Sequence, residues 1–213
     1  MPAPPSLLRL LTFLVTMLAP LAAFATDEPA PVGFVDKVEN EAKVVSGDSG
    51  ATAIIGTPVH MKDELRTGAE GRLQVTFRDN TVLTLGEKGE RRHRSLCLRP
   101  GSGCGRDCAA ATKGVFRFAS GRIKGLKQSN IAVSTPVADI GVRGTEFWGG
   151  PMDQKYGVLL LEGEVTVSNQ AGSATLSTPG QGTDIPSPLD APRPVQGWSA
   201  DKIARAVASV ALH

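Results

Sequence analysis

The residues best suited to chemistry by type and spacing gather in one short stretch of the chain. All three cysteines, Cys97, Cys104 and Cys108, lie there, and His93 comes shortly before them. Zinc sites usually pair cysteines with two to four residues between them; six and three residues intervene here, which matches that spacing only loosely. A disulfide would leave one thiol over, because the number of cysteines is odd. A zinc knuckle and a disulfide therefore stay open beside a third interpretation, given at the end of this section.

A second candidate site is the run from Gly141 to Glu146, which reads GVRGTE. An arginine so close to a glutamate can bind anions or position a carboxylate. Glycine inside a strand, however, more often marks a bulge, a bend or a close backbone approach. We therefore predict a structural role, with Arg143 pairing with a carboxylate or with carbonyl groups at a strand crossing. A β-branched residue at Gly144 is then expected to unfold the domain.

The other polar residues form no catalytic set. His60 has no second metal ligand at a usual spacing and is predicted to be a surface residue. Ser134 and Thr135 have no nearby histidine that could act as a base. Turn roles account for Asp79 and Asp139. The sequence therefore predicts a protein that is not an enzyme and that uses no cofactor and no metal.

The first 25 residues have the three-part layout of a secretory signal peptide. Arg9 supplies positive charge, an apolar run follows from Leu10 to Ala23, and small residues occupy both positions that a signal peptidase reads before Thr26. The apolar run is shorter than the roughly 20 residues that a spanning helix needs. We therefore expect residues 1–25 to be removed, and the mature chain to be periplasmic or secreted without a membrane span.

The overall charge gives no sign of a nucleic-acid partner. The chain has 23 Lys and Arg against 21 Asp and Glu, and the basic excess comes from arginines between Arg91 and Arg106. The composition indicates short strands and tight turns instead. The chain is rich in glycine (24 residues) and proline (15 residues) and poor in tyrosine (1 residue) and tryptophan (2 residues).

Strand-like patterns fill the chain from residue 33 to residue 185. The clearest is RLQVTF at 72–77, in which hydrophobic and polar residues alternate; TVLTL at 81–85 follows after a turn at Asp79-Asn80, so that the pair predicts a hairpin. Further strands are predicted at the ranges 33–45 (two strands with a turn near Asn40), 52–56, 114–118 (with Val115 and one of Phe116 and Phe118 inward), 121–125, 131–135, 137–147 (in two pieces) and 158–161. This pattern predicts an all-β sandwich, a roll or a short solenoid-like domain over residues 33–185.

The C-terminal part has a different pattern. Residues 186–197 contain four prolines and are predicted to be a linker. Residues 198–213 are predicted to form a short amphipathic helix. Its hydrophobic face comprises Trp198, Ile203, Val207 and Val210, of which the first three are expected to pack on the β domain. A helix this short is marginal alone, so docking must hold it.

Four stretches, taken in order, resemble the FecR family. They are GTPVHMKDELRTGAEGRLQVTFRDNTVLTLGE (56–87), KGVFRFASGRI (113–123), STPVADIGVRGTEFWG (134–149) and LLEGEVTV (160–167). The resemblance spans residues 56–167 and is most specific in TPVADIGVRGTEF. The residues that carry this motif are Pro136, Gly141, Arg143, Gly144 and Thr145. The resemblance implies an all-β ligand- or protein-binding domain facing the periplasm.

In the named regulators of that family, the domain belongs to a transmembrane anti-sigma factor and contacts a transporter. This chain resembles instead the stand-alone, signal-peptide-bearing members. We expect a non-catalytic recognition or scaffolding module of the bacterial cell envelope, in periplasmic sensing, with an envelope protein or a glycan as partner. Two alternatives stay open: a periplasmic signalling subunit that works through a separate membrane anti-sigma partner, and a hydrolase with an unrecognised site.

Residues 88–111 interrupt the pattern. Strand alternation stops after Gly86 and resumes at Thr112, and the segment between them holds every cysteine and a run of arginines. Such a bias is typical of GC-rich coding DNA that is translated out of frame. We therefore put forward a compensated frameshift beside a true insertion loop as the origin of this segment. Under the frameshift hypothesis, its cysteines and His93 have no evolved role, and a loose loop replaces a hairpin.

Overall fold

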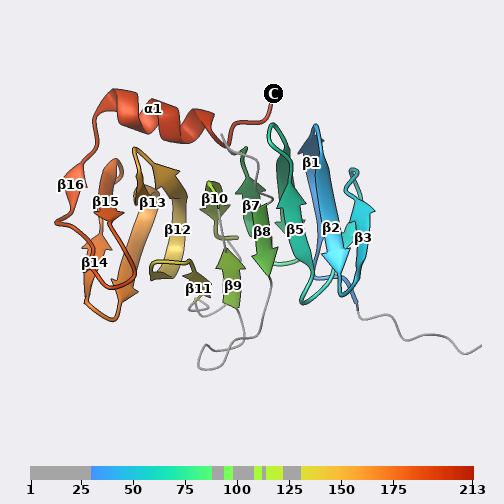
Figure 1. Cartoon of the computed structure of the whole chain (residues 1–213), viewed down its shortest axis with the longest axis horizontal. Helices are drawn as coiled ribbons and strands as arrows, with labels where there is room; N and C mark the ends of the chain where they lie inside the picture. The colour runs from blue at the N-terminus through green and yellow to red at the C-terminus, as the bar shows by residue number, and fades with distance from the viewer. Residues whose placement is uncertain (1–29, 88–93, 98–107, 112–113, 122–130) are drawn as a thin grey trace, which may run out of the picture.

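The chain folds mainly into β-strands, as the sequence predicts. The structure, a computed structural model, describes residues 30–87, 94–97, 108–111, 114–121 and 131–213. The elements in these ranges, shown in Figure 1, are β1 (Gly33–Glu39), β2 (Ala42–Ser46), β3 (Ser49–Thr52), β4 (Pro58–Val59), β5 (Glu64–Thr67), β6 (Arg72–Phe77), β7 (Val82–Leu85), β8 (Arg94–Cys97), β9 (Cys108–Ala111), β10 (Phe116–Ala119), β11 (Ile131–Ser134), β12 (Asp139–Met152), β13 (Lys155–Asn169), β14 (Gly172–Leu176), β15 (Gln181–Ile185), β16 (Gln196–Gly197) and α1 (Ala200–Ala208).

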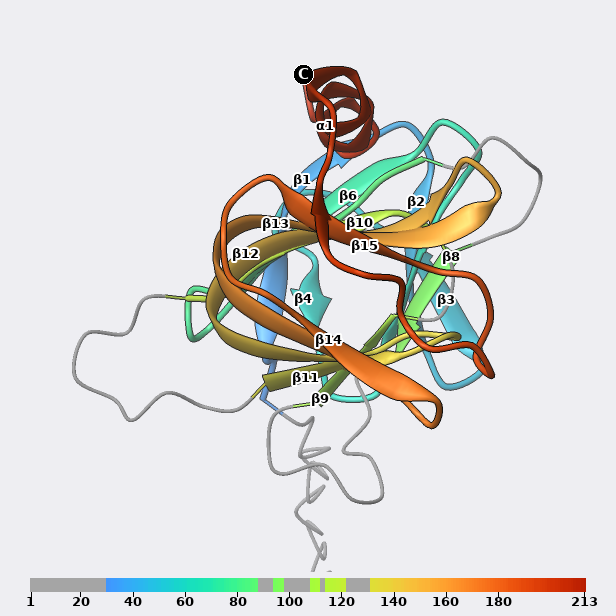
Figure 2. The same cartoon turned by 90° about the vertical axis from the view of Figure 1, so that its left-hand side faces the viewer.

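The strands form a two-layer roll. One layer runs β4-β1-β6-β7-β10 and continues through the later part of β12 and the earlier part of β13 to β15 and β16. The other layer runs β3-β2-β5-β8-β9-β11 and continues through the earlier part of β12 and the later part of β13 to β14. Figure 2, an end view, shows β12 and β13 curving from one layer into the other. Of the predicted architectures, the roll is therefore the one observed.

Alternating side chains explain the core. Leu73 and Val75 of β6 are fully buried, and in register they face Leu85 and Leu83 of β7. The predicted hairpin is confirmed, with Asn80 at φ +62° in its turn and Asp79 accepting a hydrogen bond from the backbone N–H of Thr81. The hydrophobic residues of the two layers meet in one large core cluster, because each strand presents only one face to the interior.

Of two strand predictions in the N-terminal half, one is confirmed and one is wrong. The predicted pair over 33–45 is confirmed as β1 and β2, with Asn40 between them at φ +54°. The strand predicted at 52–56 is wrong, because β3 ends at Thr52 and a turn follows, in which the Thr57 N–H donates to the carbonyl of Ile54. Ile54 is 64% exposed, so the apolar run there does not mark a buried strand.

Strand β10 buries more than the sequence predicts. Phe116 and Phe118 are both buried, where one of them was expected to point inward. Both lie on the face that contacts Phe147, with ring centroids 5.7 Å away in each case. Val115 is also buried but belongs to a second, smaller cluster under α1. Residues two apart in a strand share a face, so the two phenylalanines enter the core together.

The segment 88–111 is only partly described. Within it, β8 and β9 pair antiparallel, with Leu96 opposite Ala111 and Cys97 opposite Ala110. The loose loop expected under the frameshift hypothesis is therefore wrong for these eight backbone positions, which continue the sheet between β5 and β11. His93 and Cys104 lie outside the described residues, as do residues 122–125 of the strand predicted at 121–125.

The C-terminal helix is shorter than residues 198–213 and is docked. Ser199 caps it by accepting a hydrogen bond from the Lys202 backbone N–H. Trp198, Ala206 and Val210 are buried in the second cluster, with Ile203 packed against them. The prediction that Val207 packs on the β domain is wrong. Its side chain is 38% exposed, because the face of the helix that docks contains Ala206 instead.

Residues 186–197, predicted to be a linker, run along the sheet. Their last two residues form β16, which pairs with β15. Upstream, the Arg193 backbone N–H donates to the Asp184 carbonyl, and the Thr183 hydroxyl donates to the carbonyl of Arg193. The segment is thus part of the folded surface. In the ranges described, no helix has the length and hydropathy of a membrane-spanning segment.

Candidate functional site

The GVRGTE run forms a corner at which β12 passes between the layers. Where two β-like pieces were predicted for residues 137–147, one bent strand is observed. Gly144 has φ +60°, and Gly163 of the neighbouring strand β13 has φ +85°. The register between β12 and β13 shifts between Arg143 and Phe147, as it does at a β-bulge. The two glycines allow the strand pair to bend together, as the predicted structural role of Gly144 requires.

Thr145 fastens this corner. It is 2% exposed, and its hydroxyl donates to the Glu164 carbonyl at 2.6 Å. Its backbone N–H donates to the Ser120 hydroxyl at 2.7 Å, while the Ser120 backbone N–H donates to the Thr145 carbonyl. Thr145 therefore joins β12 to β13 and to the end of β10.

The charged residues of the run are placed separately. Glu146 accepts two hydrogen bonds from the guanidinium of Arg117, at 2.7 and 3.0 Å. Its carboxylate is thus already engaged on the surface of β10 and β12. The backbone of Arg143 pairs in register with Glu164, and its side chain lies outside the described residues. Gly141 lies within β12, opposite Thr166.

The first half of the same motif makes a tight turn between β11 and β12. The backbone N–H of Thr135 donates to the Ala138 carbonyl at 2.9 Å, and the Thr135 hydroxyl accepts from the Ala138 N–H at 3.1 Å. Pro136 occupies the exposed second position of this turn, where its fixed φ is favourable. The motif TPVADIGVRGTEF therefore forms two structures: a turn, which contains Pro136, and a corner, which contains Gly144 and Thr145.

A groove lies beside this turn. Its volume is about 440 Å³, and three segments line it: residues 135 and 137–139, residues 168–170 at the end of β13, and residues 188–189. In Figure 2 the tip of the β13–β14 hairpin and the loop that follows β15 lie next to each other at the edge of the roll. The volume is within the range typical of ligand pockets, which is about 300–1,000 Å³.

Asn169 holds the walls of the groove in place. Its side-chain amide donates to the carbonyl of Val137 at 3.3 Å and to the carbonyl of Asp190 at 2.7 Å. Its side-chain oxygen accepts from the backbone N–H groups of Ala171 and Gly172. One side chain thus ties together three segments that are distant in sequence, which makes the groove a preformed feature.

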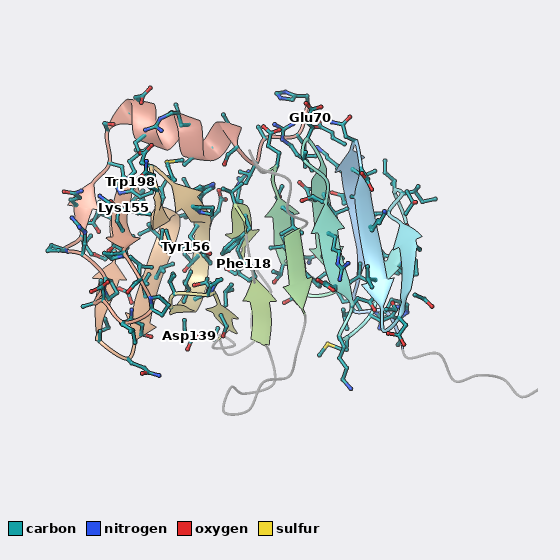
Figure 3. The ribbon with its side chains drawn as sticks, viewed as in Figure 1. Glu70, Phe118, Asp139, Lys155, Tyr156 and Trp198 are labelled. Carbon is teal, nitrogen blue, oxygen red and sulfur yellow. The ribbon has the colours of Figure 1, made fainter. Side chains whose placement is uncertain are left out.

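Asp139 supplies the charge of the groove. It is the one ionisable residue among the described residues that line it. Its carboxylate is exposed and has no hydrogen-bond or ion-pair partner in the described part of the chain. Figure 3 shows Asp139 at the end of the molecule opposite α1. The turn role predicted for Asp139 belongs to Thr135 instead, because the Thr135 hydroxyl makes the turn's side-chain hydrogen bonds.

Tyr156 lies on β13 and packs against the main core cluster. Burial raises the pKa of its phenol well above the usual value, and a side-chain hydrogen bond with Thr135 of the groove turn acts in the opposite direction. Because the chain has a single tyrosine, absorbance at the phenolate band reports this group alone.

We predict that Tyr156 stays neutral in the folded protein well above pH 10. A phenol whose pKa is raised by folding contributes stability below its unfolded pKa of about 10, and that contribution is lost as the pH rises further. A spectrophotometric titration should therefore show phenolate forming only together with unfolding, followed in parallel by circular dichroism. A phenolate signal with an ordinary midpoint and an intact fold would contradict this.

Ser46, His60 and Asp63 lie close together, but their contacts differ from those of a hydrolase triad. Asp63 is 3% exposed and accepts from the Ser46 hydroxyl at 2.5 Å and from the His60 backbone N–H at 2.6 Å. The His60 ring nitrogen Nδ1 lies 3.6 Å from Asp63, so the prediction of a plain surface histidine is wrong. Serine and histidine both face the carboxylate, and no histidine in the described residues is placed to activate the serine.

No cluster of three or more potential metal ligands occurs among the residues that the structure describes. Sequence reasoning missed the groove, since Asn169 and Leu189 belong to a hairpin tip and to a presumed linker. The available signal was the pair Asn169 and Gly172 around a short turn, which identifies a hairpin but not what it contacts.

The fold and this site define a class: a two-layer β roll with a docked C-terminal helix and a preformed groove beside a tight turn. Residues 63–166 match the family described as "FecR protein". This match confirms the resemblance to the FecR family that the motifs of residues 56–167 carry.

The fold has solved counterparts. Two crystal structures of a putative anti-sigma factor from Parabacteroides distasonis, at 2.50 and 1.65 Å resolution, are similar to this chain, with 21% sequence identity over 66% of it and TM-scores of 0.50 and 0.49. This chain spans 62% of the length of that protein in the first comparison. At such identity the likeness concerns the fold alone. No curated protein matches the chain.

Proposed function

We propose that the protein is an exported, non-catalytic recognition module of the bacterial cell envelope that binds a partner protein in periplasmic sensing. The observation that carries this proposal is the groove between residues 135 and 137–139, residues 168–170 and residues 188–189, with walls fixed by Asn169. A groove with walls held by hydrogen bonds, an exposed leucine and a carboxylate without a partner among the described residues is suited to recognition, because little ordering entropy is lost on binding.

The arrangement of the remaining polar groups supports a binding role over a catalytic one. Glu146 is engaged by Arg117, and Asp63 is engaged by Ser46 and His60. Acid–base or nucleophilic catalysis needs a nucleophile and a base within hydrogen-bond reach of each other. Ser46 and Asp63 are in contact, but the His60 ring faces Asp63 and has no contact with Ser46, so this cluster lacks the serine–histidine hydrogen bond of a hydrolase triad.

A second candidate function is that of a signalling subunit that acts through a separate membrane anti-sigma partner. It is favoured by the match of residues 63–166 to the FecR family and by the similarity of the fold to a crystal structure of a putative anti-sigma factor. Both functions need export and a protein partner. They differ in whether that partner is a membrane regulator.

The test combines localisation with partner capture. Protein from the periplasmic fraction should have the intact mass of a chain that begins at Thr26. A photo-crosslinking residue in place of Leu189, which is 80% exposed at the groove, should capture an envelope protein. The same residue in place of Ile55, which is 69% exposed on another part of the surface, is the matched control.

Retention of residues 1–25 in a cytoplasmic product would overturn the export proposal. Equal capture from both positions would mean that the groove is not the recognition surface. Identification of the Leu189 adduct as a membrane anti-sigma protein would favour the second candidate over the first.

A further inference from the structure

The groove is built for one particular kind of side chain. Its charged group is the Asp139 carboxylate, which has no partner among the described residues. The described lining holds no lysine, arginine or histidine that could neutralise it. A negatively charged group in a concave surface attracts a cation and repels an acidic ligand.

Part of the remaining lining is aliphatic, beside the polar side chains of Thr135 and of residues 168–170. Leu189 is 80% exposed, and Pro188 lies next to it in the chain. Val137, which is half-buried, adds further apolar surface from the turn at residues 135–138. An apolar wall leading to a carboxylate is complementary to a side chain with a hydrocarbon stem and a cationic head, which is the description of lysine and arginine.

The walls are rigid at the point where such a side chain would enter. The 187–190 loop is closed on itself, because the Ser187 hydroxyl donates to the Asp190 carboxylate at 2.6 Å and accepts from the Leu189 backbone N–H at 3.2 Å. Asp190 keeps its negative charge in this bond, but it is not among the residues that line the groove, where Asp139 is the carboxylate. Asn169 connects this loop to the turn at residues 135–138, because its side-chain amide donates to the carbonyls of Asp190 and Val137.

We propose that the groove binds an arginine or lysine side chain of a partner protein, with its stem on Val137 and Leu189 and its cationic head on Asp139. This rests on the proposed recognition function and names the chemistry that the partner must present. It also assigns a binding role to the turn of the TPVADIG motif, beside the structural role of the corner at Gly144.

The test uses the folded chain from residue 26 onward, labelled with ¹⁵N, and three blocked tripeptides with arginine, citrulline or glutamate between two alanines. Citrulline keeps the shape of arginine without its charge. The arginine peptide should shift the amide signals of residues 135 and 137–139, of residues 168–170 and of Leu189. The citrulline and glutamate peptides should leave them unchanged.

Variants then separate the two halves of the site. Asp139→Asn should weaken the arginine peptide about five-fold, the size expected for an exposed charge pair of about 1 kcal/mol. Leu189→Ser should weaken it as well. Asp48→Asn is the matched control, because Asp48 is an exposed carboxylate in the turn between β2 and β3, and it should bind like the parent chain.

Equal shifts with arginine and citrulline, or unchanged binding in Asp139→Asn, would overturn the proposal. Identical shifts with spermidine would overturn it too, because the site would then attract any cation. If the peptides fail while Leu189 still captures an envelope protein in cells, the recognition function stands and only the ligand chemistry falls.

Discussion

Replacing Trp198 with alanine should lower the free energy of unfolding by about 3–5 kcal/mol, the usual cost of deleting a buried tryptophan side chain. Trp198 is 7% exposed and meets Trp148 edge to face, with ring centroids 6.0 Å apart. Two glycines of the sheet, Gly157 and Gly182, leave room for its ring, since a Cβ on Gly157 would lie 2.8 Å from it. Trp198 is therefore the anchor through which α1 covers the second cluster.

Polar contacts add to this anchor. The Lys202 ammonium lies 3.7 Å from the centre of the Trp198 ring and 3.0 Å from an Asp184 carboxylate oxygen. At the other end of α1, the Trp148 indole N–H donates to the Ser209 hydroxyl at 3.0 Å. Removing Trp198 thus loosens the cation–π contact as well as the packing.

Thermal melts followed by circular dichroism measure the effect. For a domain of this size, such a loss should lower the midpoint by roughly 6–20 °C. Val207→Ala is the matched control on the same helix, because Val207 is 38% exposed, and it should change the midpoint far less. Limited proteolysis should also release the helix from the Trp198→Ala variant first. An unchanged melt for Trp198→Ala would mean that α1 is a dispensable tail.

Replacing Gly163 with alanine should lower the free energy of unfolding by about 2–4 kcal/mol, from backbone strain and overpacking together. Gly163 has φ +85°, and a Cβ there would come within 3.0 Å of the Thr145 Cα and closer still to the Gly144 carbonyl oxygen. The corner has no room for a methyl group because β12 and β13 bend at the same level. Gly144→Val, at φ +60°, should also destabilise the domain.

Gly197→Ala is the matched control for the corner. Its Cβ would meet nothing within 4 Å, and its φ lies outside the left-handed region. Urea unfolding curves for the three variants should place Gly197→Ala with the parent chain and both corner variants well below it, with the same dependence on denaturant. A corner variant that keeps its stability but loses partner capture would show that the corner is a binding site.

Local patterning determined much of the architecture. The alternation in residues 72–77 and 81–85 fixed the β6–β7 hairpin, because a strand with one buried face needs this period. A helix in the last sixteen residues followed from the spacing of Trp198, Ile203 and Val210, all of which contribute to the second cluster. The ordered motifs were sufficient to indicate the family that residues 63–166 match.

Patterns of this kind failed where the outcome depended on distant segments. The apolar residues of 52–56 resemble a strand, yet Ile54 and Ile55 lie in an exposed turn, since β4 pairs with β1 and draws the chain away from β3. Val207 fits the helical period equally well on paper. The face of α1 that docks is decided by the positions of Trp148 on β12 and of Trp198 just before α1.

The site itself was decided by tertiary structure. The sequence by itself determined the turn at Pro136 and the bend at Gly144, because proline restricts the local backbone geometry and glycine permits a positive φ. It did not determine that the turn lies against the β13–β14 hairpin and the proline-containing loop. That placement depends on Asn169, which bonds to Val137 and Asp190, 32 and 21 residues away along the chain. Only the folded chain brings the Asp139 carboxylate and the exposed side chain of Leu189 to the same groove.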